Sequence, residues 1–199
     1  MKRSQNASTI AVAAWYREDG ARFLSDLGIR LGDRVLDFGC GMGGYTIPLA
    51  QVVGSNGKVI AVDKNSSHLE ALRARLAKEP GRGIVDVRLT DGELALAWIA
   101  GNFLNAVLLF DVLQFVSDWD GLFSSLRRLL KPMGLVLINP THLSHPGGVD
   151  VERLKDRMKK HGFVLERTKR ALVMHYDFLC EEEILVFRTA ETAGAFPSC

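Results

Sequence analysis

The residues with the clearest chemical potential are the glycines of a short turn at residues 39–44. Glycine occupies positions 39, 41, 43 and 44, after an apolar run and before a helical pattern that begins near Tyr45. Glycine permits sharp bends and lets bare backbone approach a ligand. The amino end of the following helix adds N–H donors and partial positive charge to the same space. The turn therefore predicts a site for a nucleotide-like ligand, with Cys40 as a small residue that leaves its amide free.

An acidic residue beside this turn discriminates between two kinds of ligand. The spacing Gly39-x-Gly41-x-x-Gly44 also occurs in dinucleotide-binding turns, and by itself it is a weak signal. Asp37 lies two residues before the first glycine, where a carboxylate repels a pyrophosphate and attracts the ammonium group of an amino acid. This charge favours S-adenosylmethionine over a dinucleotide.

The turn and its acid resemble the first motif of the class I S-adenosylmethionine-dependent methyltransferases, which is Asp-x-Gly-x-Gly-x-Gly after a hydrophobic strand. The similarity extends over about residues 33–140. It implies that Asp63, after a second strand, accepts the ribose hydroxyls, although an acid at this place indicates a ribose in dinucleotide enzymes as well. It implies that Asp91 and Gly92 contact the adenine. The cofactor-binding residues implied by the resemblance are Asp37, Gly39, Cys40, Gly41, Gly43, Tyr45, Asp63, Lys64, Asp91, Gly92, Phe110 and Asp111.

Three histidines are candidates for a catalytic base. A sulfonium is an excellent leaving group, so alignment of the acceptor with the methyl carbon can supply most of the catalysis. A hydroxyl or ammonium acceptor must also lose a proton, and His142, His145 and His175 are expected near the ligand-binding edge of the sheet. The competing interpretation is that these histidines are solvated loop residues without a catalytic role.

The methyl acceptor is predicted by exclusion to be a small molecule. Residues 110–113 read FDVL, which lacks the Asn/Asp-Pro-Pro-aromatic motif of related enzymes that methylate amino groups of adenine, cytosine or glutamine. Two other functions remain open. One is an NAD(P)-dependent oxidoreductase that uses the glycine spacing, against which Asp37 argues. The other is a protein that binds S-adenosylmethionine without catalysis.

The elements that position these residues alternate in the manner of parallel α/β sheets. Apolar runs end near residues 38, 63, 89, 110 and 139, with helical patterns between most of them. Two further β-rich segments, residues 163–173 and 184–188, have no helix between them, so they should pair antiparallel, with residues 174–177 as their turn. We therefore expect an α/β fold: a Rossmann-like, doubly wound, mostly parallel seven-stranded sheet with an antiparallel C-terminal hairpin strand and helices on both faces.

The 199 residues suit a single compact domain. Within it, residues 1–32 are expected to form a helical cover segment, and residues 33–199 to form the class I methyltransferase-like domain. The residues expected on the buried side of the cover segment are Trp15, Phe23, Leu24 and Leu27.

Composition narrows the classes of partner. The 25 basic and 23 acidic residues give a net charge of +2, which is too small to attract nucleic acid or an anionic membrane through the overall electrostatic field. The longest apolar stretch, residues 103–116, is too short to cross a bilayer. Three widely spaced cysteines match neither a disulfide framework nor a zinc pattern, so no metal site is expected. We expect a cytoplasmic protein without a nucleic-acid partner, and the sequence indicates no oligomeric state.

Overall fold

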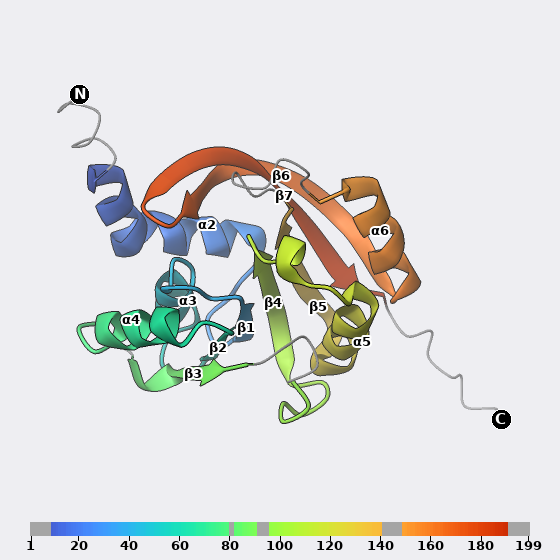
Figure 1. The fold of residues 1–199 in the computed structure, drawn as a ribbon, viewed down its shortest axis with the longest axis horizontal. Helices are drawn as coiled ribbons and strands as arrows, with labels where there is room; N and C mark the ends of the chain where they lie inside the picture. The colour runs from blue at the N-terminus through green and yellow to red at the C-terminus, as the bar shows by residue number, and fades with distance from the viewer. Residues whose placement is uncertain (1–8, 80–81, 91–95, 141–148, 191–199) are drawn as a thin grey trace.

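The computed structural model describes residues 9–79, 82–90, 96–140 and 149–190. These residues form a 7-stranded sheet in the order β3-β2-β1-β4-β5-β7-β6 (Figure 1). The first five strands in this order, β3, β2, β1, β4 and β5, are parallel to one another, whereas β7 is antiparallel to both β5 and β6. The strands are β1 (Arg34–Phe38), β2 (Lys58–Asp63), β3 (Val85–Leu89), β4 (Leu104–Phe110), β5 (Leu130–Asn139), β6 (Phe163–His175) and β7 (Phe178–Thr189). The predicted Rossmann-like sheet with an antiparallel C-terminal hairpin is confirmed.

Helices cover both faces of the sheet, as a doubly wound fold requires. Residues 9–14 are helical and lead into η1, and the helices from there on are η1 (Trp15–Asp19), α2 (Gly20–Leu27), α3 (Thr46–Val53), α4 (Ser66–Leu76), η2 (Arg82–Ile84), η3 (Leu113–Phe115), α5 (Trp119–Leu129) and α6 (Val151–Lys160). One face packs against α5 and α6, and the other packs against η1, α2, α3 and α4. Strand β4 is apolar on both sides for this reason: Val107 and Leu109 face the first layer, and Ala106 and Leu108 face the second. No helix in the described ranges has the length and apolar character needed to cross a membrane.

The N-terminal helices pack against the glycine turn and α3. The indole Nε1 of Trp15 donates to the carbonyl of Gly44 at 2.8 Å, which joins η1 directly to the turn. The predicted buried side of this segment is confirmed, because its four apolar side chains are at most 8% exposed. The N-terminal segment therefore helps to position the turn, although 29 residues separate Trp15 from Gly44.

Helix α4 begins at a different cap from the one its sequence predicts. The spacing of Ser67 and Glu70 predicts a capping box. In the structure Asn65 is the cap: its backbone is extended, and its side-chain Oδ1 accepts from the amides of Ser67 at 3.0 Å and His68 at 3.4 Å. The prediction is wrong because Asn65 already satisfies the free amides of the first turn. This cap brings the amino end of α4 next to Asp63, whose Oδ1 accepts the Asn65 amide.

Strands β6 and β7 form a longer hairpin than the sequence predicts. Strand β6 continues to His175 and β7 starts at Phe178, so the turn contains two residues, Tyr176 and Asp177, instead of four. Half of the residues added at the start of β7 are acidic, and these residues, at 181–183, read as a break in the apolar pattern. They belong to the strand because pairing with β6 continues residue by residue to the turn. The hairpin arches over α2 (Figure 1), and Arg167 and Lys169 of β6 both donate to Asp26 of that helix.

Candidate functional site

The turn between β1 and α3 adopts the backbone shape that its glycines predict. Gly39, Gly41 and Gly43 have φ angles of 79°, 52° and 89°, in the left-handed region that glycine adopts most easily. Two of them are also crowded: a Cβ on Gly39 would lie 2.5 Å from Val112, and one on Gly43 would lie 2.4 Å from Leu72. Backbone angle and space both require glycine at 39, where Val112 Cβ would also lie within 2.9 Å. At Gly43 the backbone angle is the stronger reason, because the contact is with a terminal methyl of Leu72, and Gly41 has no described atom within 4 Å of an added Cβ.

The turn is fastened to the end of β2 by its own amides. Gly39 and Cys40 both donate their backbone N–H to the Val62 carbonyl, at 2.8 and 3.0 Å. The prediction that Cys40 leaves its amide free for a ligand is therefore wrong. The amide is used to hold the turn against β2, and the Cys40 side chain is buried at the edge of the cavity described next.

A cavity of about 540 Å³ lies beside the turn, at the carboxyl ends of the central parallel strands. Open α/β sheets bind ligands at this edge, and the volume is in the range of small-ligand sites. The structure brings most of the predicted cofactor residues together in its wall. These are Gly39, Cys40, Gly41, Tyr45, Asp63, Lys64, Phe110 and Asp111.

Asp63 ends β2 and presents a fixed carboxylate to the cavity. The residue is 9% exposed, and each oxygen accepts one backbone amide at 2.8 Å, Oδ2 from Gly41 and Oδ1 from Asn65. A carboxylate has about four lone-pair positions, so both oxygens keep acceptor capacity. The arrangement can accept two more hydroxyl donors in a defined orientation.

Asp37 lies behind the turn, not in the cavity wall. It is 3% exposed, and its Oδ2 accepts from the Thr46 hydroxyl at 2.6 Å. Burial, together with the charge of Asp63, raises the pKa of Asp37 to about 7, although the Thr46 hydrogen bond acts in the opposite direction. Among the described residues predicted to bind cofactor, Asp37 and Gly43 are outside the wall. The contact of Asp37 with an ammonium group therefore stays a prediction.

The end of β4 forms the opposite side of the cavity. Asp111 has a φ angle of 54°, which is uncommon for a residue with a side chain, and its Oδ2 lies 2.5 Å from His175 Nδ1. The ring of Tyr45 packs edge-on against Phe110 with 4.6 Å between centroids. The Tyr45 hydroxyl donates to the Met174 carbonyl at 3.1 Å and accepts the Met174 amide at 3.0 Å. Tyr45 thereby joins the glycine turn to the end of the hairpin.

His175 is buried between two carboxylates. It is 5% exposed, with Nδ1 beside Asp111 and Nε2 at 3.2 Å from Glu182 Oε1. Burial lowers the pKa of His175, but the two acidic partners outweigh this effect and raise it overall. Within the described part of the chain, Asp111 lines the cavity and His175 does not. A role for His175 as the base that touches an acceptor stays a prediction.

Four of the predicted site residues are outside the described ranges. Asp91 and Gly92, expected at the adenine, lie in the segment 91–95. His142 and His145, expected as bases, lie in the segment 141–148. Their roles stay predictions.

Other residues of the cavity wall carry no local sequence signal. Tyr16 from η1 and Arg75 from α4 meet above the turn: the Arg75 guanidinium lies 4.1 Å from the Tyr16 ring and donates to its hydroxyl at 3.0 Å. Arg75 also donates to the Met42 carbonyl at 3.0 Å. Elsewhere in the wall, Lys64 Nζ lies 5.5 Å from the centre of the Phe115 ring. These contacts join distant segments, so a motif search along the sequence does not find them.

Residues 35–134, half of the chain, match the methyltransferase domain family. This region contains the glycine turn, Asp63 and the end of β4. Demethylmenaquinone methyltransferase from Staphylococcus aureus strain MRSA252 is 32% identical over 116 residues, which are 58% of this chain and 46% of that protein. The chain thus spans about half the length of the curated relatives it matches.

Solved structures share the fold at low sequence identity. A SAM-dependent methyltransferase from Aquifex aeolicus has a TM-score of 0.67 at 19% identity, covering 89% of this chain and 93% of that one. The cyclase SpnF has a TM-score of 0.67 at 16% identity, covering 86% of this chain and 81% of that one. Because a methyltransferase and a cyclase both adopt it, the fold does not fix the reaction. The match over residues 35–134 does establish kinship: this chain belongs to the methyltransferase domain family.

Proposed function

We propose that this protein binds S-adenosylmethionine in the cavity beside the glycine turn and transfers its methyl group to a small-molecule acceptor. The observation that carries the proposal is the Asp63 carboxylate, held by the Gly41 and Asn65 amides at the edge of a cavity that lies within the region of the family match. A nucleoside with two free hydroxyls is the ligand that this fixed double acceptor suits best.

The other cavity residues have proposed roles that follow from their places. Gly39 and Gly41 bring bare backbone to the amino-acid half of the cofactor, and Cys40 and Tyr45 bound the same space. Asp37, with its pKa raised to about 7, is only partly ionised near neutral pH, and its charged form favours a cationic ligand on the far side of the turn. Bound S-adenosylmethionine supplies an activated methyl group on a sulfonium, so the protein's main task is to position the acceptor.

The acceptor is proposed to bind between the N-terminal cover and the hairpin. The cover of residues 1–32 contributes Tyr16 to the cavity wall, and the hairpin contributes Met174 and Tyr176. These aromatic and thioether groups suit a largely apolar small molecule. The name of the Staphylococcus aureus relative makes demethylmenaquinone the first acceptor to test.

Removal of a proton from the acceptor is assigned to the acidic and histidine residues of this edge. Of the two carboxylates beside His175, Asp111 is the one that lines the cavity, so His175 acts on an acceptor through Asp111. His142 and His145 remain candidates for direct contact. Alanine replacement of each histidine, with turnover measured at saturating cofactor, tests these roles, and unchanged rates in all three variants exclude them.

Calorimetric titration distinguishes the proposed cofactor from a nicotinamide dinucleotide. We expect S-adenosylmethionine to bind with a stoichiometry of one, and NAD and NADP to give no binding heat. The reverse pattern would support the oxidoreductase interpretation and contradict the proposal.

Transfer is tested separately with a cofactor labelled in its methyl group. A panel of small phenols, quinols, amines and carboxylates, with demethylmenaquinone among them, is expected to include at least one labelled product. Tight cofactor binding without transfer to any member of the panel would favour a binding protein over an enzyme.

A further inference from the structure

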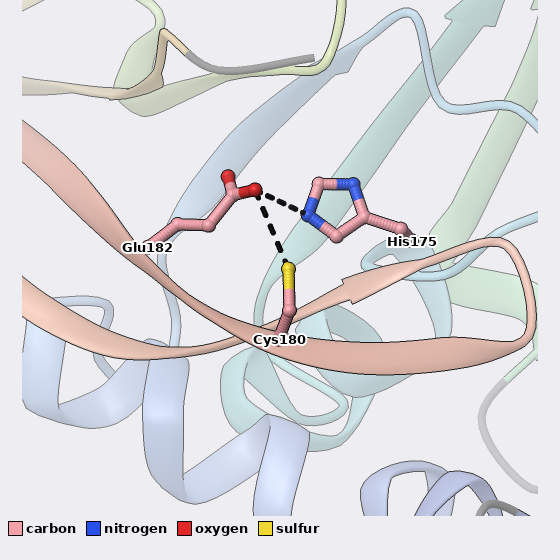
Figure 2. A group of neighbouring side chains, drawn as sticks. All are labelled: His175, Cys180 and Glu182. Carbon is pink, nitrogen blue, oxygen red and sulfur yellow. Dashed lines mark hydrogen bonds and ion pairs between the residues drawn. The ribbon is translucent and has the colours of Figure 1, made fainter. Parts of the chain in front are cut away.

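A cluster of metal-ligating side chains lies beyond the cavity wall, inside the end of the hairpin. Figure 2 shows His175, Cys180 and Glu182 directed toward one another from β6 and β7. Strand pairing explains the convergence, because His175 is opposite Phe178, and Cys180 and Glu182 follow on alternate positions of β7. Alternate residues share one face of a strand, so the three side chains meet although the sequence has no metal-binding spacing.

The three possible donor atoms are close enough to share one ion. His175 Nε2 lies 3.2 Å from Glu182 Oε1, Cys180 Sγ lies 3.4 Å from the same oxygen, and all three atoms are within 4.8 Å of one another. In a tetrahedral zinc site, bond lengths of about 2.0–2.3 Å place neighbouring ligand atoms roughly 3.3–3.6 Å apart. The two shortest separations in the cluster match that spacing closely.

The outer atoms of the cluster are already oriented as metal ligands usually are. His175 Nδ1 contacts Asp111 Oδ2, and Glu182 Oε2 accepts from Asn139 Nδ2 at 2.6 Å. A carboxylate on the far nitrogen of a histidine and a hydrogen bond on the far oxygen of a carboxylate are the supports that fix ligands around metals. With their outer atoms bound to Asp111 and Asn139, His175 Nε2 and Glu182 Oε1 face Cys180 (Figure 2).

Unsatisfied buried atoms are concentrated in the same place. His175 Nε2 lies 3.2 Å from Glu182 Oε1, and it makes no hydrogen bond of good geometry with any residue that the structure describes. Asp111 Oδ1 and Asn139 Oδ1 are also buried without a described partner, so of the four such atoms found, one belongs to the cluster and two belong to residues that contact it. Buried polar atoms are nearly always paired, so these atoms can accept a water molecule or an ion as a further partner.

We propose that His175 Nε2, Cys180 Sγ and Glu182 Oε1 bind a divalent cation of the zinc class. Nitrogen, thiolate sulfur and one carboxylate oxygen are the donors that zinc prefers, whereas calcium and magnesium take oxygen ligands. Three protein ligands leave one tetrahedral position for water or another donor. The inference goes beyond the proposed methyl transfer and does not depend on it.

Binding of the cation exchanges protons for metal bonds. A cysteine binds metal as its thiolate, so Cys180 Sγ must lose its proton when the cation binds. Formation of the sulfur–metal bond releases this proton to solvent, and a charged imidazole releases the proton of Nε2 in the same way. The cation then offsets the negative charge of the thiolate and of the two carboxylates that surround His175.

The site would stiffen one wall of the cavity. Met174 and Tyr176, which flank His175, both line the cavity, so a cation that joins the two strands holds these residues in place. A histidine that binds metal through Nε2 cannot take a proton there. In the metal-bound protein, Asp111 is then the group of this cluster that can accept a proton from the acceptor.

Cobalt binding tests the proposal without any measurement of activity. The full chain is freed of metal with a chelator and titrated with Co²⁺, which absorbs in the near ultraviolet when a thiolate is bound and in the visible when it is four-coordinate. We expect both absorptions to saturate at one equivalent, and Zn²⁺ to displace the cobalt. Absence of the near-ultraviolet band in the unaltered chain overturns the proposal.

Matched variants locate the site. We expect Cys180→Ser to abolish the thiolate band, and Cys40→Ser and Cys199→Ser to keep it. Glu182→Gln should weaken Co²⁺ binding at least about tenfold, whereas Glu183→Gln, at the exposed neighbour, should leave it unchanged. A band that survives in Cys180→Ser, or disappears in Cys199→Ser, contradicts the assigned site.

Discussion

The glycine turn and the end of the β6–β7 hairpin flank one cavity, yet they are built in opposite ways. The turn uses main-chain shape: glycines with positive φ angles and amides that bond to Val62 and Asp63. The hairpin end uses side chains, with an enclosed polar cluster around His175. The first kind of site leaves a compact motif in the sequence, and the second appears only when strands are paired in register. The two regions meet through the Tyr45 hydroxyl.

Gly39→Ala tests whether backbone shape governs the turn. The variant adds left-handed strain and a contact with Val112, and we expect it to lower the free energy of unfolding by about 4 kcal/mol. Gly41→Ala is the matched control, because it adds strain in open space and should cost only about 1 kcal/mol. Urea unfolding measures both, and equal losses would show that the space around Gly39 is irrelevant.

Asp37→Asn tests the charge behind the turn. The folded-state pKa of Asp37 is about 7 and the ordinary value is 3.8, so between these pH values the folded chain holds a proton that the unfolded chain has lost. The contribution of Asp37 to stability is therefore complete below pH 3.8 and declines as pH rises to about 7.

We expect the asparagine variant to lack this decline. At pH 8 it should be more stable than the unaltered chain by on the order of 2 kcal/mol, and near pH 4 the difference should vanish. Thermal or urea unfolding as a function of pH measures the difference. A constant offset at every pH would mean that Asp37 does not titrate in this interval.

Tyr45→Phe tests the hydrogen bonds that connect the glycine turn to the hairpin. The variant leaves the Met174 amide and carbonyl without their partner, and we expect a loss of about 1 kcal/mol with faster hydrogen exchange at the end of β6. Tyr16→Phe removes a hydroxyl that accepts from Arg75 and leaves β6 unaffected. Unchanged hydrogen exchange at the end of β6 in Tyr45→Phe would show that the Tyr45 hydroxyl does not hold the hairpin to the turn.

The sequence predicts the sheet because its central strands are covered on both faces and read as continuous apolar runs, as in residues 106–110. It predicts the glycine turn and Asp63 because their chemistry depends on neighbours close in the chain. It does not predict that Asn65 caps α4, since two acceptable caps lie within three residues of each other and only the backbone decides between them.

The hairpin end could not be predicted in the same way. The acidic residues at 181–183 break the apolar pattern of β7, so the sequence predicts a strand that starts only at Ile184. The meeting of Cys180 and Glu182 with His175 depends on the register of β6 against β7. Likewise, Tyr16 and Arg75 reach the cavity from two helices that no local pattern brings together. Sites assembled from distant side chains require the fold before they can be recognised.

The central claim is that Asp63 and the glycine turn hold S-adenosylmethionine, and calorimetric titration of Asp63→Ala tests it most directly. The account predicts that the variant binds this ligand about 1–3 kcal/mol more weakly than the unaltered chain, through the lost hydrogen bonds to the ribose. Asp86→Ala, at a carboxylate paired with Arg88 on β3, should bind as the unaltered chain does. Equal affinity in Asp63→Ala and the unaltered chain would contradict the account.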